Sequence, residues 1–496
     1  MDREQNLTRV RDRTKSWDII VIGGGATGVG CAVDAASRGY DVLLVEQHDF
    51  GKGTSSRSTK LIHGGVRYLA QGNLSLVREA LRERGILLRN APHVVHKQAF
   101  IVPCYSPWQV LYYGTGLKIY DLLSGKNSFG RSRFLSRNDT ADKLPGIIKK
   151  GLVGGVLYFD GQFDDTRLLI DLVKTGIDQG ATILNYARVT SLAKNSDGNI
   201  QTVEFDDALT GETFMADAKV VINATGAFCD AVRELAESGS KPLVTLSQGI
   251  HLVFDRKFFP SKNALMIPRT SDGRVLFCIP WHGHTLVGTT DTPISDAGLE
   301  PHALDAEIDF ILDSIGKYLS EKPMRGDVLS AFAGIRPLVR SNANRKTSSL
   351  SRSHTIDIND AGLLTVTGGK WTTYRQMAED AIDQAVKLAG LEPQISVTAT
   401  LSINPQPETP AESSLLHSDL PYTEGDVAAA VQNEMARTVE DVLARRTRAL
   451  FLNARAAVEI APNVADLIAP LLGKDSAWKA SQIEEFKKVA YNYLLR

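Results

Sequence analysis

The stretch that decides the fold, residues 18–46, reads DIIVIGGGATGVGCAVDAASRGYDVLLVE. It opens with an apolar, mostly β-branched run, 19–22, which is too short for a helix and predicts a buried parallel strand. A glycine-rich turn and a helical pattern that ends at Gly39 follow, and a second apolar run, 42–45, completes the unit. Strand, turn, helix and strand in this order predict a Rossmann-like α/β domain with a doubly wound sheet.

The turn has the glycine spacing that binds the phosphates of a dinucleotide. Gly23 allows the tight turn, Gly25 lets the backbone approach a pyrophosphate, and Gly28 lets the helix pack closely on the strand. The helix N-terminus offers unpaired N–H groups and the positive end of its dipole. Glu46 stands where an acceptor for ribose hydroxyls belongs. A glycine-rich turn between core strands is the simpler alternative. The complete unit favours a bound dinucleotide, and the fingerprint alone suits NAD as well as FAD.

Composition limits the class of protein. The 496 residues suffice for two or three domains, and the apolar fraction of 43% and charged fraction of 23% are ordinary for a globular chain. A net charge of −1 gives no basic field that would suggest nucleic acid. The cysteines form no CxxC pair, so we expect buried free thiols in a reducing compartment. They are Cys31, Cys104, Cys229 and Cys278.

Targeting and membrane signals are few. Residues 1–17 mix acids and bases without an apolar core, so we expect neither a secretory signal nor a transit peptide. No stretch approaches the ~20 apolar residues of a spanning helix. Residues 110–123 have a helical period within an aromatic-rich segment that carries lysines. This pattern suits an interfacial helix in a bilayer headgroup region, and equally an ordinary helix packed between domains.

A loop at residues 51–69 alternates small hydroxyl residues, glycines and bases without helical or strand periodicity. Such a loop can hold phosphates through backbone N–H groups, hydroxyls and a lysine ammonium. A solvated Ser/Thr linker is the alternative, but the bulky apolar residues that alternate with bases in its second half favour function. The predicted cofactor contacts here are Thr54, Ser55, Ser56, Thr59, Lys60 and Leu61.

Two later segments repeat the pattern of an apolar strand that ends in a turn of small residues, at 218–226 and at 362–374. Ligands of a doubly wound sheet lie at the carboxyl ends of its strands, so both turns are expected to contact the nucleotide. The predicted contacts outside the first unit and the loop are Val189, Thr225, Gly226, Gly369, Lys370, Trp371 and Thr372.

Residues 241–333 are β-rich and predict a separate, antiparallel, substrate-facing sheet. A Pro/Thr-rich linker, 404–410, then leads to a helical region. We therefore expect three domains. They are a cofactor-binding domain of residues 17–100, 151–240 and 355–392, a substrate-binding or cap domain of residues 101–150 and 241–354, and a C-terminal helical domain of residues 405–496.

Four motifs together resemble the FAD-dependent glycerol-3-phosphate dehydrogenase family. They are IGGGATGxGxAxDAASRG, TSSRSTKLIHGGVRYL, GIRPL and TGGKWTTYR, and the resemblance covers most of residues 17–390. The second and fourth are specific, whereas many flavoproteins share the first. The resemblance implies noncovalent FAD and a substrate domain like that of D-amino-acid oxidase. It also implies oxidation of sn-glycerol 3-phosphate to dihydroxyacetone phosphate, with hydride transfer to flavin N5. The electrons would pass to a membrane quinone, or to oxygen as in the related oxidases.

The resemblance also assigns residues to the substrate. The implied substrate contacts are Arg67, Tyr68, His251, Arg336, Arg352 and Lys370. Of these, His251, Arg336 and Lys370 are the predicted catalytic residues, and no metal is expected.

Arg336 and Arg352 would clamp the substrate phosphate, because planar guanidinium groups bind a dianionic phosphate well. Arg340 or Arg345 could take the place of Arg352, since the register of this polar, basic segment is open. His251 is the leading general base because a neutral imidazole titrates near the operating pH. A core histidine, a surface arginine and a helix-capping lysine are the plain alternatives for His251, Arg336 and Lys370.

Two other functions are compatible with the fold. A flavin amine oxidase acts on a carboxylate and needs one arginine clamp, so a cluster of bases disfavours it. A non-catalytic flavin-binding scaffold or tRNA-modification partner would not reduce its flavin with substrate. We expect a quinone-linked enzyme in the cytoplasm, peripheral on the inner face of the cell membrane, without nucleic-acid partners. The helical tail could form a homodimer interface or cover the substrate sheet.

Overall fold

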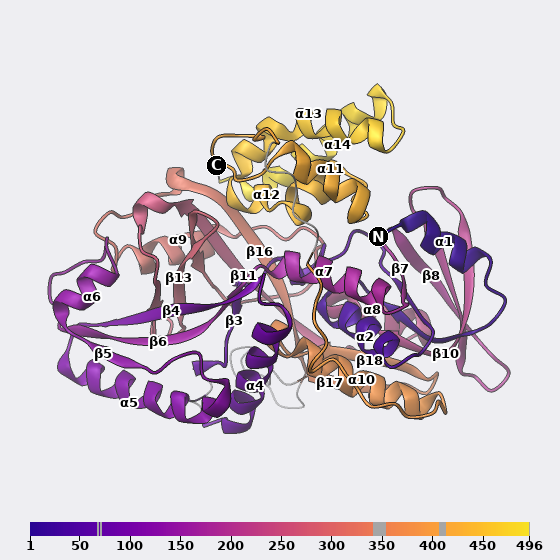
Figure 1. The fold of residues 1–496 in the computed structure, drawn as a ribbon, viewed down its shortest axis with the longest axis horizontal. Coiled ribbons are helices and arrows are strands. Elements are labelled where there is room, and N and C mark those ends of the chain that lie inside the picture. The colour runs from indigo at the N-terminus through magenta and orange to yellow at the C-terminus, as the bar shows by residue number, and fades with distance from the viewer. Residues whose placement is uncertain (67–68, 70–71, 341–353, 406–412, 496) are drawn as a thin grey trace.

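Two large sheets lie beside each other, and a group of C-terminal helices packs along one side of both (Figure 1). This arrangement is seen in a computed structural model that describes residues 1–66, 69, 72–340, 354–405 and 413–495. Both the N-terminal helix α1 (Arg3–Arg11) and the C-terminal helices contact the segments around the first sheet.

The first sheet has eight strands and is built around β1 (Trp17–Ile22), whose apolar side chains are almost completely buried. The parallel order β18-β10-β1-β2-β7 is that of a doubly wound sheet, with antiparallel β17 at the edge. The helix after the glycine turn, α2, lies between α7 and α10. The predicted α/β fold is confirmed. The bounds are β2 (Val42–Val45), β7 (Thr182–Leu184), β10 (Thr213–Asn223), β17 (His354–Ile358), β18 (Leu363–Gly368), α2 (Ala26–Ser37), α7 (Asp165–Asp178) and α10 (Tyr374–Leu388).

The apolar pattern of residues 181–189 favours a single strand, but the structure divides this segment between two strands. The chain leaves β7 at Asn185, and Tyr186 adopts a left-handed conformation with φ of 56°. The next strand, β8 (Ala187–Lys194), then pairs with β9 (Ile200–Asp207) instead of continuing along β2. An apolar pattern does not show one left-handed residue, so it cannot predict this break.

The second sheet has ten strands in the order β15-β11-β14-β13-β12-β4-β6-β3, with β16 paired to β11 and β5 to β6. The β-rich segment predicted at 241–333 is confirmed, and its long strands β11 and β16 run antiparallel over their full length. The bounds are β3 (Leu61–Ile62), β4 (Val95–Cys104), β5 (Arg133–Leu135), β6 (Gly154–Phe163), β11 (Val244–Asp255), β12 (Ala264–Ile267), β13 (Leu276–Trp281), β14 (His284–Gly288), β15 (Thr292–Ile294) and β16 (Val328–Val339).

Strands β4 and β6 change the predicted division of the chain. They pair with each other over ten residues inside the second sheet, although the predicted ranges place residues 95–100 and 154–163 in the cofactor-binding domain. The apolar pattern identifies these strands but carries no information about which sheet they join.

Helices cover the outer faces of the two sheets. The helical period at 110–123 belongs to α5, and α4 precedes it in the chain. Asn73 and Ser106 cap the N-termini of α4 and α5. Among the described residues, no helix has the length and apolar character needed to cross a membrane. The remaining bounds are α4 (Leu74–Asn90), α5 (Pro107–Ser124), α6 (Arg137–Lys143), α8 (Cys229–Ala236), α9 (Asp305–Ile315), α11 (Glu424–Asn433), α12 (Ala449–Leu452), α13 (Ala454–Leu471) and α14 (Ser476–Ala490).

A buried ion network joins the C-terminal helices to the loop that follows β2. The carboxylate of Asp49 accepts hydrogen bonds from Arg445 at 2.5 Å and from Arg446 at 2.7 and 2.8 Å. Lys52 pairs with Glu440 and with Glu300, the latter at 3.0 Å. Burial raises the pKa of the Asp49 carboxyl, but the two arginines outweigh it and hold that pKa well below its usual range. The predicted C-terminal helices are thus held against the loop after β2 by buried ion pairs. All four cysteines are buried and free, as expected.

Candidate active site

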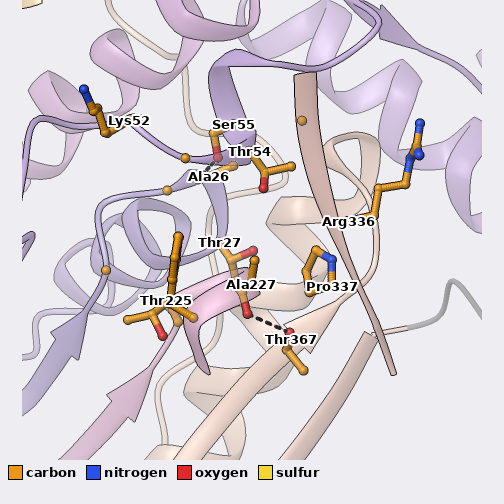
Figure 2. Close-up of a pocket in the computed structure, with 18 of the residues that line it drawn as sticks. Ala26, Thr27, Lys52, Thr54, Ser55, Thr225, Ala227, Arg336, Pro337 and Thr367 are labelled. Atoms are coloured by element: carbon orange, nitrogen blue, oxygen red, sulfur yellow. Dashed lines mark hydrogen bonds between the residues drawn. The ribbon is translucent and has the colours of Figure 1, made fainter. Parts of the chain in front are cut away.

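A cavity of about 630 Å³ lies between the two sheets, at the carboxyl ends of β1, β2 and β10. Its lining comes from four of the predicted segments: the glycine turn, the loop after Gly51, the turn after β10 and the turn after β18. Figure 2 shows Lys52 on one side of this lining and Arg336 on the other, with Thr27, Thr54 and Ser55 between them. The cavity therefore extends from the first sheet to strand β16 of the second.

The glycine turn lies where a dinucleotide phosphate would meet the start of α2. A Cβ atom at Gly28 would lie 1.9 Å from the carbonyl oxygen of Gly23, so only glycine permits the observed packing of α2. Gly25 caps α2 without a side chain, which leaves N–H groups of its first turn facing the cavity. The Glu46 carboxylate accepts from the Gly24 N–H at 2.6 Å and lines the same cavity. The residues present fit an extended dinucleotide.

The loop after Gly51 is held over the cavity by contacts with both sheets. Thr54 donates its hydroxyl to the Ile335 carbonyl at 2.6 Å, and the Trp371 Nε1–H donates to the Ser55 carbonyl at 2.9 Å. Ser55 Oγ also accepts from the Ala26 N–H at 2.9 Å. The loop is thus fixed against the glycine turn, β16 and the turn after β18.

Most of the predicted cofactor contacts lie together in this lining. They are Gly23, Gly25, Glu46, Thr54, Ser55, Thr59, Leu61, Val189, Thr225, Gly226, Gly369, Lys370, Trp371 and Thr372. Gly28, Ser56 and Lys60 are not part of it.

Lys60 lies on the far side of the loop. Its ammonium is completely buried and donates to Asp165 at 2.8 and 2.9 Å and to the Ser56 carbonyl at 2.6 Å. Ser56 itself donates its hydroxyl to the Gly51 carbonyl at 2.6 Å. This corrects the expectation that the Lys60 ammonium reaches a phosphate. The partner, Asp165, lies more than 100 residues away in the chain, so no local pattern indicates it.

His251 lies on β11 and faces the cavity. Its ring stacks on Phe332 at 5.0 Å between centroids, and its Nε2 lies 2.9 Å from Thr59 Oγ1. A Cβ atom at Gly288, the residue paired with His251 on β14, would lie 2.1 Å from the ring. Burial lowers the pKa of His251 well below 6.5, and the charges of Lys60 and Arg336 lower it further. The imidazole is therefore neutral at neutral pH and can accept a proton.

Arg336 comes from β16, and its guanidinium lies across the neighbouring strand β11. Nη2 donates to Thr289 Oγ1 at 3.0 Å and Nη1 to the Gln248 carbonyl at 3.3 Å. A Cβ atom at Gly249 would lie 2.2 Å from Nη2, so the absence of a side chain there makes room for the guanidinium. Arg336 also lines a smaller cavity of 150 Å³ next to the first, which Thr59 shares.

Other predicted substrate residues are placed differently. Arg67, Tyr68, Arg345 and Arg352 lie outside the described residues. Arg340 is described, and its Nε donates to the Val244 carbonyl at 2.9 Å, away from the cavity lining. Lys370 lines the cavity together with His251 and Arg336.

Sequence reasoning missed the residues that make room for the site. Gly288 is paired directly with His251 across β14 and β11, whereas Gly249 lies on β11 two residues from Ser247, the partner of Arg336 on β16. Glycine inside a strand often marks such a close approach, which is the signal that could have identified them. Arg274, which lines the smaller cavity, carries no comparable signal among the many bases of the chain.

Comparison with known proteins agrees with this geometry. A family model described as FAD dependent oxidoreductase matches residues 18–375, and one described as the C-terminal domain of alpha-glycerophosphate oxidase matches residues 396–479. The mitochondrial glycerol-3-phosphate dehydrogenase of Homo sapiens is 40% identical over 99% of this chain and 75% of its own length.

Solved structures show the same fold. The glycerol-3-phosphate dehydrogenase from Bacillus halodurans complexed with FAD has a TM-score of 0.79 and 28% identity, covering 99% of this chain and 97% of that one. The L-alpha-glycerophosphate oxidase from Mycoplasma pneumoniae with FAD bound has a TM-score of 0.61 and 17% identity, covering 79% of this chain and all 100% of that one. The second likeness shows the fold alone. FAD is the cofactor of this chain.

The steric limit at Gly28 gives a test of the cofactor site. We expect Gly28→Ala to be purified with little bound flavin, because its methyl group would collide with the Gly23 carbonyl and displace the start of α2. The measurement is flavin absorbance per polypeptide. Gly326→Ala is the matched control, since a Cβ atom there meets nothing within 4 Å. Normal flavin content in Gly28→Ala would contradict the assignment.

Proposed function

We propose that this chain, which belongs to the FAD-dependent glycerol-3-phosphate dehydrogenase family, oxidises sn-glycerol 3-phosphate to dihydroxyacetone phosphate and passes the electrons to a membrane quinone. The observation that carries the proposal is the joint placement of a neutral imidazole and a guanidinium, His251 and Arg336, in the lining of the FAD cavity. Oxidation of a phosphorylated secondary alcohol needs a proton acceptor and an anion clamp, and these two residue types supply both.

The cofactor would be held by the residues of the first sheet. Gly23, Gly25 and the first turn of α2 would bind the phosphates, and Glu46 would accept a ribose hydroxyl. FAD held there would supply the hydride acceptor for oxidation of the substrate carbon. Thr54, Ser55 and the turn at Gly369 would hold the middle and the ring end of the extended nucleotide.

His251 would take the hydroxyl proton of the substrate. Thr59 orients the ring through Nε2, and the stacked Phe332 restricts its tilt. Because the low pKa keeps the imidazole neutral, the base is in its active form throughout the neutral range. Lys370 would contribute positive charge next to the substrate, since it lines the same cavity.

Arg336 would bind the substrate phosphate, with Arg67, Tyr68 and Arg352 as further proposed contacts. Its hydrogen bonds to Thr289 and Gln248 fix the guanidinium before substrate arrives. The smaller cavity of 150 Å³ is lined by two carboxylates, Asp160 and Asp291, as well as by two arginines. The guanidinium groups of Arg274 and Arg336 would there offer contacts to more than one anionic oxygen. This disfavours an amine oxidase, whose carboxylate substrate needs a single clamp.

The clamp role predicts a selective loss of activity. In Arg336→Ala we expect kcat/KM for glycerol 3-phosphate to fall on the order of 100-fold or more, because a charge-assisted contact to the dianion is removed. Flavin content should stay normal. Steady-state turnover with an artificial acceptor, together with flavin absorbance, measures both.

Arg340→Ala is the matched control, because Arg340 is a neighbour in the chain whose guanidinium lies outside the lining. Equal losses in the two variants would remove Arg336 from the clamp role, as would flavin loss comparable to that of Gly28→Ala. Turnover of glycine or D-alanine in place of glycerol 3-phosphate would overturn the proposed substrate.

The His251 environment predicts a pH profile. Its pKa is lowered from 6.5, so the proton-accepting form persists below pH 6.5 and is lost only as pH falls through the lowered value. We therefore expect the acid limb of kcat/KM to lie below pH 6.5. An acid limb at or above that value, or full activity in His251→Ala, would exclude the histidine as base.

Helix α5 supports the proposed membrane location. It lies at the outer edge of the second sheet in Figure 1, away from the C-terminal helices. Five large apolar or aromatic side chains on it are exposed: Trp108, Leu111, Tyr112, Ile119 and Leu122. Trp108 is 69% and Leu122 81% exposed, which is unusual for such residues. We propose that this face lies in a headgroup region on the cytoplasmic side of a membrane, where the quinone is reached.

The membrane proposal predicts a separable defect. We expect Trp108→Ser/Leu122→Ser to bind phospholipid vesicles several-fold more weakly, because apolar area that would enter the bilayer is removed. Reduction of the flavin by glycerol 3-phosphate should be unchanged. Co-sedimentation with vesicles and stopped-flow reduction measure the two effects.

Ile395→Ser, at a residue that is 89% exposed outside α5, serves as control. Unchanged vesicle binding in the double variant would reject α5 as the contact.

The electron acceptor is tested by reoxidation of the reduced enzyme. Faster reoxidation by oxygen than by a quinone analogue would make the protein an oxidase.

A further inference from the structure

A second large cavity, of about 490 Å³, shares no lining residue with the FAD cavity. It lies where the first residues of β4 and the end of β6 meet the β13–β14 turn, the start of α7 and Arg448 of the C-terminal region. Trp281, in its lining, has the Lys60 ammonium 5.1 Å from its ring centre. Lys60 is the neighbour of Thr59, so the two cavities lie on opposite sides of one loop.

The charge of this cavity is positive and only partly balanced. Four cations line it, against the single carboxylate of Asp164. Arg448 pairs with Asp164 at 2.6 Å, and Arg167 pairs with Glu434 at 2.8 Å. The other two, Arg256 and Lys262, are exposed and form no ion pair with any carboxylate of the described residues. Two positive charges thus remain uncompensated at the mouth of the cavity.

Buried donors without partners point to a ligand in the same place. The Trp281 indole is only 4% exposed, and its Nε1–H has no hydrogen-bond partner among the described residues. The buried Nη2 of Arg167 likewise lacks one. Because buried polar groups in folded proteins are nearly always satisfied, both donors are available to an acceptor from outside the protein, either water or the oxygen of a ligand.

Four histidines also line this cavity, but they do not indicate a metal. They are His93, His96, His282 and His284. His93 lies 3.0 Å from Asp171, and His282 lies 3.2 Å from Asp164, so both rings are already engaged. Within the described part of the chain, no group of three His, Cys, Asp or Glu side chains is arranged to hold a metal ion.

We propose that this cavity is a second anion site, which binds a small solute carrying a phosphate or pyrophosphate group independently of the active site. A dianion matches the two uncompensated charges of Arg256 and Lys262, and its oxygens can accept from Trp281 and Arg167. The volume admits a phosphorylated metabolite rather than a bare ion alone. The ligand would lie next to Arg448, whose partner Asp164 precedes Asp165, the carboxylate that holds Lys60 beneath the active-site loop.

The test titrates sodium pyrophosphate, as the probe, into FAD-loaded protein. Binding is measured by isothermal titration calorimetry at low ionic strength. All variants carry Arg336→Gln, which removes the proposed phosphate clamp of the active site. In this background we expect one saturable pyrophosphate site per chain. Adding Arg256→Gln/Lys262→Gln should weaken binding by about 10- to 100-fold, because two charge-assisted contacts are lost.

Lys257→Gln is the matched control, since Lys257 is an exposed neighbour of Arg256 that does not line the cavity. It should change the affinity less than about twofold, because exposed charges contribute little when they make no direct contact. Absence of saturable binding in the Arg336→Gln background would overturn the proposal. Equal weakening by Lys257→Gln and by the double variant would also overturn it, by showing non-specific attraction. Flavin content measures whether each variant is folded. The substituted residues at the mouth of the cavity are exposed, so we expect normal flavin content in every variant.

Discussion

The rest of the structure depends on how closely α2 approaches the end of β1. At Gly28 the backbone of the helix comes so near the Gly23 carbonyl that even a methyl group has no room. At Gly23 itself, a side chain would meet the backbone of Ala224, just past the end of the neighbouring strand β10, at 2.8 Å. These contacts bring the N-terminus of α2 and the ends of three parallel strands to one edge, and the FAD cavity opens there. The loop after Gly51 and the turn after β18 then have a fixed surface on which to pack.

Sequence reasoning succeeded where function resides in the local backbone and failed where it depends on distant partners. The glycine turn, Glu46 and the turn at Gly369 could be predicted because spacing along the chain determines their geometry. Lys60 could not, because its orientation is decided by Asp165, a buried carboxylate that begins a helix far along the chain. The sheet membership of β4 and β6 escaped prediction for a related reason. Pairing partners are chosen during folding of the whole chain, and an apolar alternation is the same in either sheet.

The alternative interpretation of His251 turns out to be compatible with the proposed functional one. His251 is indeed a core residue, since it is 2% exposed and stacked on Phe332, and that burial is what lowers its pKa. Arg336, for which a surface arginine was the alternative, is only partly exposed, and its hydrogen bonds hold it across β11. In both cases a glycine on an adjacent strand, Gly288 or Gly249, provides the space. Structural constraints and the proposed catalytic ones thus act on the same residues, and local composition cannot separate them.

The ion network at Asp49 has a consequence for the order of events in biosynthesis. Asp49 and Lys52 belong to the loop that begins the FAD cavity, but their charged partners lie at Glu440, Arg445 and Arg446. On a ribosome, Asp49 leaves the exit tunnel 396 residues before its partner Arg445 does. Until then a carboxylate suited to burial lacks its counter-ions, and burying it alone is costly. The loop that lines the cofactor cavity therefore gains its buried counter-ions only after the chain has been made as far as Arg446.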